Sequence, residues 1–209
     1  MASRKPQRSV PGHTAREDIL AAAKRLMRRH GYDKTTMQHV VAEAGTSIGN
    51  AYFYFRNKDE LLAEVIRRVL DERWAENERV IATLAPGPRR IATVIYGNAI
   101  SMLGHDRKLI QAVIETQERS AAVRDYSVAR WLPILADCCP FLSGNARALA
   151  ATMIYGANRM LIGQAVTVLA AVPDAEIGIF AAQWSLRALG FADPEVDDAL
   201  RTARRVIGG

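Results

Sequence analysis

Apolar residues recur along the chain at intervals of three and four positions, the spacing that places them on one face of an α-helix. In the N-terminal third this pattern predicts three short helices, over about 15–30, 36–44 and 48–53, and then a longer helix to about residue 83. Residues able to cap a free backbone N–H precede these helices, namely Thr14, Thr35, Ser47 and Asn57. Gly31 and Gly45 are expected at helix ends, where glycine readily adopts a left-handed conformation.

The same pattern continues through the rest of the chain. Pro88 suits the first turn of a helix that reaches Gly104. Further helices are expected near 107–117 with Asp106 as the cap, over 121–138 with a bend at Pro133, and over 145–170. Two more begin at the Pro173-Asp174 and Asp193-Pro194 pairs. No alternating pattern predicts a strand, so the chain is expected to be all-α.

The segment from Thr35 to Glu60 has the pattern of a helix-turn-helix that reads DNA. On its second helix Ala51 and Phe55 are expected to face inward, and the outward positions are Ser47, Ile48, Gly49, Asn50, Phe53 and Tyr54. Asn50 can bond to adenine through both ends of its amide, and Ile48 can contact a thymine methyl. Thr36 and Lys58 lie at the starts of neighbouring helices, where free N–H groups attract phosphate.

Charge supports this interpretation without proving it. Residues 1–60 hold 11 Lys or Arg against 6 Asp or Glu, so most of the net charge of +6 lies near the helix-turn-helix. Such a surplus favours phosphate binding, although a basic N-terminus also serves solubility alone. Residues 1–13 lack apolar periodicity and are expected to form a flexible basic arm. With 49% hydrophobic and 24% charged residues, the chain should fold.

Other classes of protein find little support. Cys138 and Cys139 are adjacent, which fits neither a disulfide framework nor a metal site and suggests a reducing compartment. The apolar run from Met160 to Val172 is too short for a membrane span, and the N-terminus lacks a signal peptide, so a cytoplasmic location is expected. The histidines show no ligand spacing, and no nucleophile has a positioned base. We therefore expect no metal, no cofactor and no enzymatic activity.

The N-terminal segment resembles the TetR (tetracycline repressor-like) family of bacterial transcriptional regulators over about residues 15–64. The family pattern is matched in register by Thr35, Thr36, Met37, Val40, Ala44, Gly45, Ser47, Gly49, Ala51, Tyr52, Phe55, Lys58 and Leu61. The chain departs from the family's usual residues at Val41, Thr46, Ile48, Asn50 and Tyr54. These departures preserve the fold expectation but prevent transfer of another member's operator sequence.

The resemblance implies roles for individual positions. Thr36, Tyr52 and Lys58 correspond to phosphate contacts, whereas base or groove contacts usually arise at Gln38, Ile48, Gly49, Asn50, Phe53 and Tyr54. Alternatives remain open for several of them. The aromatic run at 52–55 could pack against the following helix, Lys58 could be an ordinary surface charge, and His39 could simply be solvated.

The resemblance also implies a helix-turn-helix domain over 14–57 and a larger helical domain over 58–209 for ligand binding and dimerisation. The two long C-terminal helices would form the homodimer interface through Gly156, Ala157, Met160, Gly163, Phe180 and Trp184. A pocket for a small apolar or aromatic effector would be lined by Trp74, Tyr96, Asn98, Met102, Gln117, Trp131, Tyr155 and Asn158. Both the interface residues and the pocket residues could instead be part of the ordinary intramolecular core.

The sequence therefore predicts a dimeric repressor that binds a palindromic DNA operator and is released by a small molecule. A dimeric regulator without a small-molecule ligand and an all-helical enzyme are the alternatives.

Overall fold

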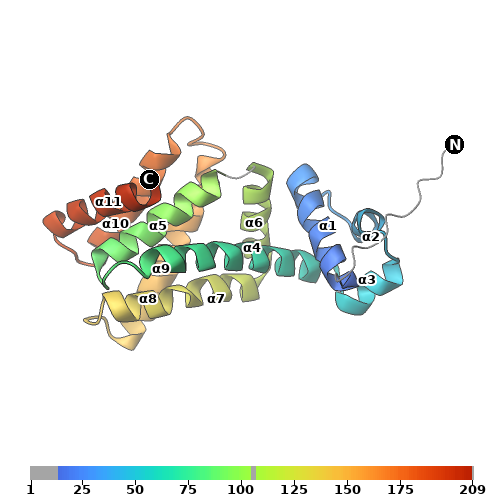
Figure 1. Ribbon diagram of the computed structural model, residues 1–209, viewed down its shortest axis with the longest axis horizontal. Helices are drawn as coiled ribbons and strands as arrows, with labels where there is room; N and C mark the ends of the chain where they lie inside the picture. The colour runs from blue at the N-terminus through green and yellow to red at the C-terminus, as the bar shows by residue number, and fades with distance from the viewer. Residues whose placement is uncertain (1–13, 105–106, 209) are drawn as a thin grey trace.

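The computed structural model describes residues 14–104 and 107–208, and every regular element within them is an α-helix (Figure 1). The all-α expectation is confirmed. The predicted arm at 1–13 and the predicted cap Asp106 lie outside the described residues. The molecule is elongated, with a three-helix unit at one end, a larger helical bundle at the other and a long helix running between them. None of the described helices combines the length and apolar character needed to cross a membrane.

The three-helix unit consists of α1 (Ala15–His30), α2 (Met37–Ala44) and α3 (Ile48–Tyr54). The caps predicted at Thr14 and Ser47 are present, since their side chains accept hydrogen bonds from the backbone N–H groups of Glu17 and Asn50. Gly45 ends α2 with φ 67° and ψ 33°, the left-handed conformation that permits the tight turn into α3. A fully buried core fixes the angle between α2 and α3, with Ile19, Met27, Val40, Ala51 and Phe55 among its residues.

The predicted start of α2 was wrong by one residue. Thr36, not Thr35, is the cap, and its hydroxyl oxygen accepts from the N–H of His39 at 3.2 Å. Thr35 is fully buried and its hydroxyl donates to the carbonyl of Gly31 at 2.7 Å. Two adjacent threonines offer the same capping chemistry, and burial selects Thr35 for the core.

Helix α4 (Lys58–Ile81) joins the two ends of the molecule (Figure 1). The predicted cap Asn57 is present, with its side chain accepting from the N–H of Glu60 at 2.8 Å. Residues 64–72 of α4 form ion pairs with α1. Arg16 pairs with Glu64 at 3.1 Å, Lys24 pairs with Glu72 at 2.9 Å, and Arg68 pairs with Glu17. A movement of α4 will therefore carry the three-helix unit with it.

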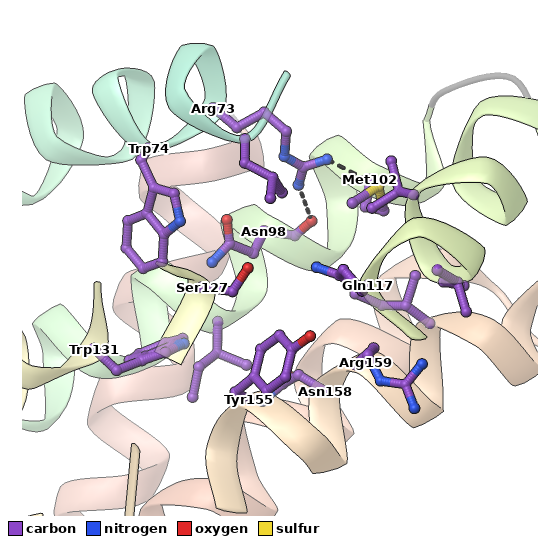
Figure 2. Close-up of a pocket in the computed structure, with 15 residues that line it drawn as sticks. Arg73, Trp74, Asn98, Met102, Gln117, Ser127, Trp131, Tyr155, Asn158 and Arg159 are labelled. Atoms are coloured by element: carbon purple, nitrogen blue, oxygen red, sulfur yellow. Dashed lines mark hydrogen bonds between the residues drawn. The ribbon is translucent and has the colours of Figure 1, made fainter. Parts of the chain in front are cut away.

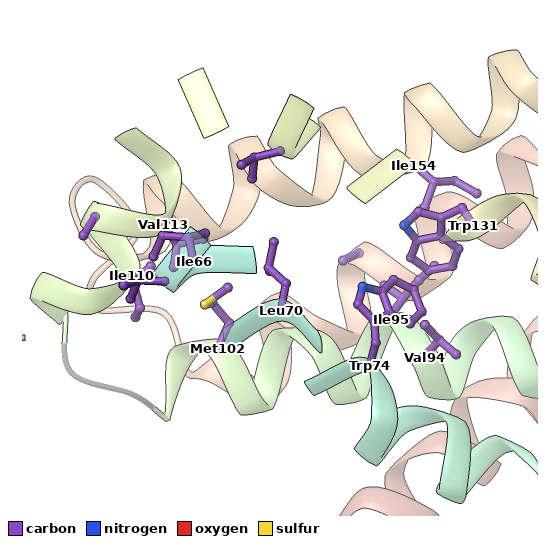
Figure 3. Close-up of a cluster of buried hydrophobic side chains, with 14 of the residues drawn as sticks. Ile66, Leu70, Trp74, Val94, Ile95, Met102, Ile110, Val113, Trp131 and Ile154 are labelled. Carbon is purple, nitrogen blue, oxygen red and sulfur yellow. The ribbon is translucent and has the colours of Figure 1, made fainter. Parts of the chain in front are cut away.

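The larger bundle follows α4 in the order α5 (Pro88–Leu103), α6 (Arg107–Arg119), α7 (Ala121–Ala129), α8 (Trp131–Cys138), α9 (Gly144–Ala165), α10 (Asp174–Ala188) and α11 (Asp193–Gly208). Helix α5 packs most extensively against α10 and α11. Buried side chains from α4, α5, α6, α8 and α9 form a continuous apolar core, in which Leu70, Ile95, Val113, Trp131 and Ile154 are labelled in Figure 3.

Two predicted helices in this bundle differ from the observed ones. The segment 121–138 forms two helices that meet at Arg130, rather than one helix bent at Pro133. Proline lacks the N–H that would bond to the carbonyl of Ala129, so a new helix begins and Pro133 falls in its first turn. Helix α9 ends at Ala165, about five residues before its predicted end, where the N–H of Thr167 bonds to the carbonyl of Gln164 at 3.0 Å, three residues back instead of four.

Candidate DNA-binding surface and ligand pocket

The outward face of α3 carries large apolar side chains that the rest of the described protein leaves exposed. The side chains of Ile48, Tyr52 and Phe53 are 40%, 50% and 81% exposed. A Cβ added at Gly49 would meet no atom within 4 Å, so the helix backbone is also open here. Gln38 is exposed on α2. An exposed apolar face on a rigid, capped helix is typical of a binding surface.

Three of the predicted contact residues also make local hydrogen bonds that organise this surface. The hydroxyl groups of Thr36 and Ser47 cap α2 and α3. The side-chain amide of Asn50 donates to the hydroxyl of Thr46 at 2.8 Å. An amide nitrogen has two N–H donors, so Asn50 keeps a second one for a base edge.

The sequence predicts Tyr54 on the outward face, but the structure places it at the edge of that face, and a DNA contact from Tyr54 stays a prediction. Its ring is half-buried, packs edge-to-face on Phe53 at 5.1 Å between centroids, and contacts the core of the three-helix unit. Ala51, Tyr54 and Phe55 are spaced i, i+3 and i+4, so one helix face contains all three. The alternative reading of the aromatic run as an internal junction therefore holds for Tyr54 and Phe55, but not for Tyr52.

Lys58 is engaged within the protein. Its ammonium donates to the carbonyls of Tyr32 and Asp33 at 3.3 and 3.5 Å and lies 4.7 Å above the Tyr32 ring. The Tyr32 hydroxyl donates to Asp59 at 2.5 Å, and burial together with this bond raises the pKa of Tyr32. These contacts hold the segment before α2 against the start of α4. A phosphate contact from Lys58 stays a prediction.

The larger bundle contains a pocket of about 90 Å³ between α4, α5, α6, α7, α8 and α9 (Figure 2). Seven of the eight predicted residues line it: Trp74, Asn98, Met102, Gln117, Trp131, Tyr155 and Asn158. Trp74 and Trp131 pack edge-to-face with ring centroids 5.6 Å apart, which gives the pocket an aromatic wall.

Tyr96, the eighth predicted residue, does not line the pocket. Ile95, Asn98 and Met102 form the pocket face of α5 at the spacing i, i+3 and i+7. Tyr96 lies one step further round the helix and packs against Gly178 of α10. A step of about 100° around an α-helix is enough to exchange one face for the next.

Arg73, Ser127 and Arg159 also line the pocket, although the sequence pattern did not single them out, together with Leu70, Ile95, Val113, Ile114 and Ile162. Arg73 is 8% exposed and donates to the carbonyl of Asn98 at 2.7 Å and to the sulfur of Met102 at 3.0 Å. Burial lowers the pKa of its guanidinium to about 10. The signal was present in the sequence, because Leu70, Arg73, Trp74 and Asn77 follow the i, i+3, i+4, i+7 spacing of an inward face.

The predicted dimer residues occupy a partly apolar outer face of α9 and α10. The side chains of Met160, Phe180 and Trp184 are 57%, 59% and 41% exposed. Ala157 lines a groove with Phe180 and Trp184, and a Cβ at Gly156 would meet nothing within 4 Å. Gly163 differs, since a Cβ there would lie 3.3 Å from Ile114 of the same chain. Gly163 thus faces its own bundle.

Comparison with known proteins identifies the N-terminal segment. The sequence model described as "Bacterial regulatory proteins, tetR family" matches residues 19–65, which include α2, α3 and the capped start of α4. The uncharacterized HTH-type transcriptional regulator YfiR of Bacillus subtilis is 38% identical over 74 residues, covering 32% of this chain and 36% of that protein. The alignments thus span about a third of the curated relatives' length.

Solved structures extend the similarity of fold to most of the chain. SmeT, the repressor of the Stenotrophomonas maltophilia multidrug efflux pump SmeDEF, is 25% identical with a TM-score of 0.62, covering 85% of this chain and 90% of SmeT. FadR of Bacillus subtilis, solved in complex with stearoyl-CoA, has a TM-score of 0.65 at 18% identity, covering 81% of this chain and 96% of FadR. The larger bundle therefore has the fold of these regulators.

Proposed function

We propose that the chain, as a member of the tetR family of bacterial regulatory proteins, is a transcriptional repressor. It binds a palindromic DNA operator as a homodimer, and a small molecule releases it from the DNA. The observation that carries the DNA-binding role is the α3 face, where Ile48, Tyr52 and Phe53 are exposed on a capped helix. In this proposal α3 enters the major groove, Gln38, Ile48, Asn50 and Phe53 read bases, and Thr36 and Tyr52 contact phosphates.

Dimerisation is supported by the outer face of α9 and α10. Met160, Phe180 and Trp184 are exposed there, and a second copy related by a two-fold axis would cover them. A two-fold dimer presents two copies of α3, which suits an operator with two symmetric half-sites. We accordingly assign residues 14–57 to DNA binding and residues 58–209 to ligand binding and dimerisation.

Helix α6 supports a route from the pocket to the three-helix unit. Val113, Ile114 and Gln117 line the pocket, and Arg119 at the end of the same helix pairs with Asp33 at 3.3 Å. The Arg119 guanidinium also lies 4.8 Å from the Tyr32 ring centroid. A ligand that prefers one position of α4 and α6 would shift the spacing of the two α3 helices through these contacts.

A regulator without a small-molecule ligand is the second candidate, because a cavity of about 90 Å³ lies below the size of most ligand pockets. Release of DNA by a small compound would distinguish a ligand-controlled repressor from a regulator without a small-molecule ligand.

The DNA-binding role is tested by selecting duplexes from a random library and measuring mobility shifts on the enriched sequence. We expect a palindrome, and we expect Tyr52→Ala to weaken binding about tenfold or more without lowering the melting temperature. Phe141→Ala is the matched control, because it removes another exposed aromatic ring outside the three-helix unit and should leave affinity unchanged. Failure to enrich any sequence, or equal affinity of wild type and Tyr52→Ala, would contradict the proposed docking.

A further inference from the structure

The pocket contains a positive charge that the described protein does not balance. Within residues 14–104 and 107–208 no carboxylate lies at ion-pair distance from the Arg73 guanidinium, and its hydrogen bonds go to a carbonyl oxygen and a thioether sulfur. Burial lowers the pKa of Arg73, and the field of the Glu76 carboxylate offsets only part of that effect. With a pKa of about 10 the group remains a cation at neutral pH. A buried cation without an anion is costly, so its presence calls for an explanation.

Among the described residues, the partly buried Arg124 and Arg147 also donate to backbone carbonyls and have no carboxylate partner, but neither is as deeply buried as Arg73. Arg159 lines the same pocket, but its guanidinium pairs with Glu118 at 3.1 Å. Arg130 pairs at 2.8 Å with Asp71, which lies two residues before Arg73 on α4. Among the described arginines, Arg73 is therefore the one that is both buried and without a carboxylate partner.

A second polar group of the pocket also lacks a partner. The Tyr155 hydroxyl is buried and makes no hydrogen bond to the described protein atoms. Figure 2 shows Tyr155 reaching into the pocket from α9 while Arg73 approaches from α4 on the opposite side. Buried polar groups are nearly always hydrogen-bonded, so an unpaired hydroxyl facing a cavity points to a ligand that supplies the partner.

We propose that this pocket binds a small aromatic carboxylate. The carboxylate pairs with the Arg73 guanidinium, whose planar fork has N–H groups beyond the two used by Asn98 and Met102. The ring lies along the wall made by Trp74 and Trp131, and the Tyr155 hydroxyl bonds to a polar atom of the ligand. A volume of about 90 Å³ restricts the ligand to about one ring. The pocket itself carries this inference, and only its effect on DNA rests on the proposed function.

The test compares acids with their neutral amides. Benzoate, 4-hydroxybenzoate and phenylacetate, each beside its primary amide, are titrated into the full-length protein by calorimetry and thermal unfolding. We expect at least one acid to bind tenfold or more tightly than its amide and to raise the melting temperature. Arg73→Met should remove this preference, whereas Arg79→Met, which deletes an exposed arginine from the same helix, should keep it.

The variant should fold, because methionine is apolar, similar in length and removes an unpaired buried charge. We expect the ligand-free melting temperature of Arg73→Met to equal or exceed that of wild type, which a merely structural arginine would not allow. If Arg73→Met does not fold, the proposal is tested with Arg73→Gln, which should also lose the preference for acids, and with the ratio of acid to amide affinities of the wild type. Absence of binding by all three acids, equal binding of acids and amides, or a preference that survives in Arg73→Met would overturn the proposal.

A mobility shift on the selected operator separates this inference from the proposed function. Acids that bind but leave the DNA complex intact would support the aromatic carboxylate site and contradict ligand-controlled repression. Neutral compounds that release the DNA, without any preference for acids, would support ligand-controlled repression and overturn the carboxylate site.

Discussion

At the scale of single residues, Gly178 of α10 leaves room for the Tyr96 ring of α5 that a larger residue would not. A Cβ at Gly178 would lie 2.8 Å from the Tyr96 ring and 3.3 Å from the Cβ of Ala99. Gly178→Ala should therefore lower the free energy of unfolding by about 1–3 kcal/mol, because the ring must move within a packed interface. Urea unfolding followed by circular dichroism measures this change.

The matched control is Gly144→Ala on α9, where an added Cβ would meet nothing within 4 Å. That substitution should be neutral or slightly stabilising, since alanine is a better helix former than glycine. Replacing Tyr96 by Leu should reduce the cost of Gly178→Ala. Equal effects of the two glycine substitutions would show that the Tyr96 ring yields without strain.

Single residues also show where sequence reasoning about the site succeeds and fails. Most pocket residues could be predicted, because a polar or aromatic residue on an otherwise apolar helix face is visible in the sequence. Tyr96 was predicted to line the pocket and Tyr54 to face DNA, but each lies on a neighbouring face of its helix that packs against the core. A shift of one residue is enough to move a side chain from one helix face to the next. Arg73 was missed because arginine is usually solvated, although the helical spacing places it on the inward face of α4, where it is 8% exposed.

At the scale of elements, the junction of α1 and α4 depends on Glu64. Its carboxylate accepts hydrogen bonds from Arg16 at 3.1 Å and Arg67 at 3.0 Å. Burial alone would raise the pKa of Glu64, but the bonds from Arg67 and Arg16 outweigh it, and the pKa lies below its ordinary value of 4.5. A lowered carboxylate pKa adds stability above about pH 4.5 that is lost as the pH falls through the folded-state pKa.

Glu64→Gln should therefore destabilise the protein at pH 7 by about 1 kcal/mol, a value reduced by solvent screening of its exposed arginine partners. The difference from wild type should shrink as the pH falls below 4.5. Urea unfolding at a series of pH values measures it. Glu72→Gln is the control, because Glu72 is 66% exposed in its pair with Lys24 and should contribute little at any pH. A difference that grows in acid would reverse the assigned sign.

Helix starts were predicted better than helix ends, for a physical reason. A start is marked by a capping side chain next to the N–H groups it satisfies, as at Thr14, Ser47 and Asn57. Where no glycine marks the end of a helix, the end depends on whether the backbone groups of the last turn make helical hydrogen bonds or bond to other groups. At the end of α9 the N–H groups of Thr167 and Leu169 both bond to the carbonyl of Gln164, and between α7 and α8 the missing N–H of Pro133 interrupts the helix.

At the scale of the whole molecule, the all-α fold could be predicted from periodicity, whereas the uncovered face of α9 and α10 was expected only from the family resemblance. The sequence names Phe180 and Trp184 as large apolar residues, but only the folded chain shows that they are 59% and 41% exposed while Ala181 and Ser185 beside them are buried. A face of this kind on two long helices is the surface we assign to the dimer.

Phe180→Glu should convert the protein to a monomer, because a carboxylate would be buried without a partner in each half of a two-fold interface. Each chain should remain folded and helical by circular dichroism, since Phe180 is exposed within one chain. Sedimentation velocity measures the mass of the particle. Operator affinity should fall because a monomer contacts only one half-site of the operator. Phe53→Glu is the control: Phe53 is 81% exposed on α3, so its replacement should abolish DNA binding while the dimer persists. A Phe180→Glu protein that still sediments as a dimer would place the interface on another face.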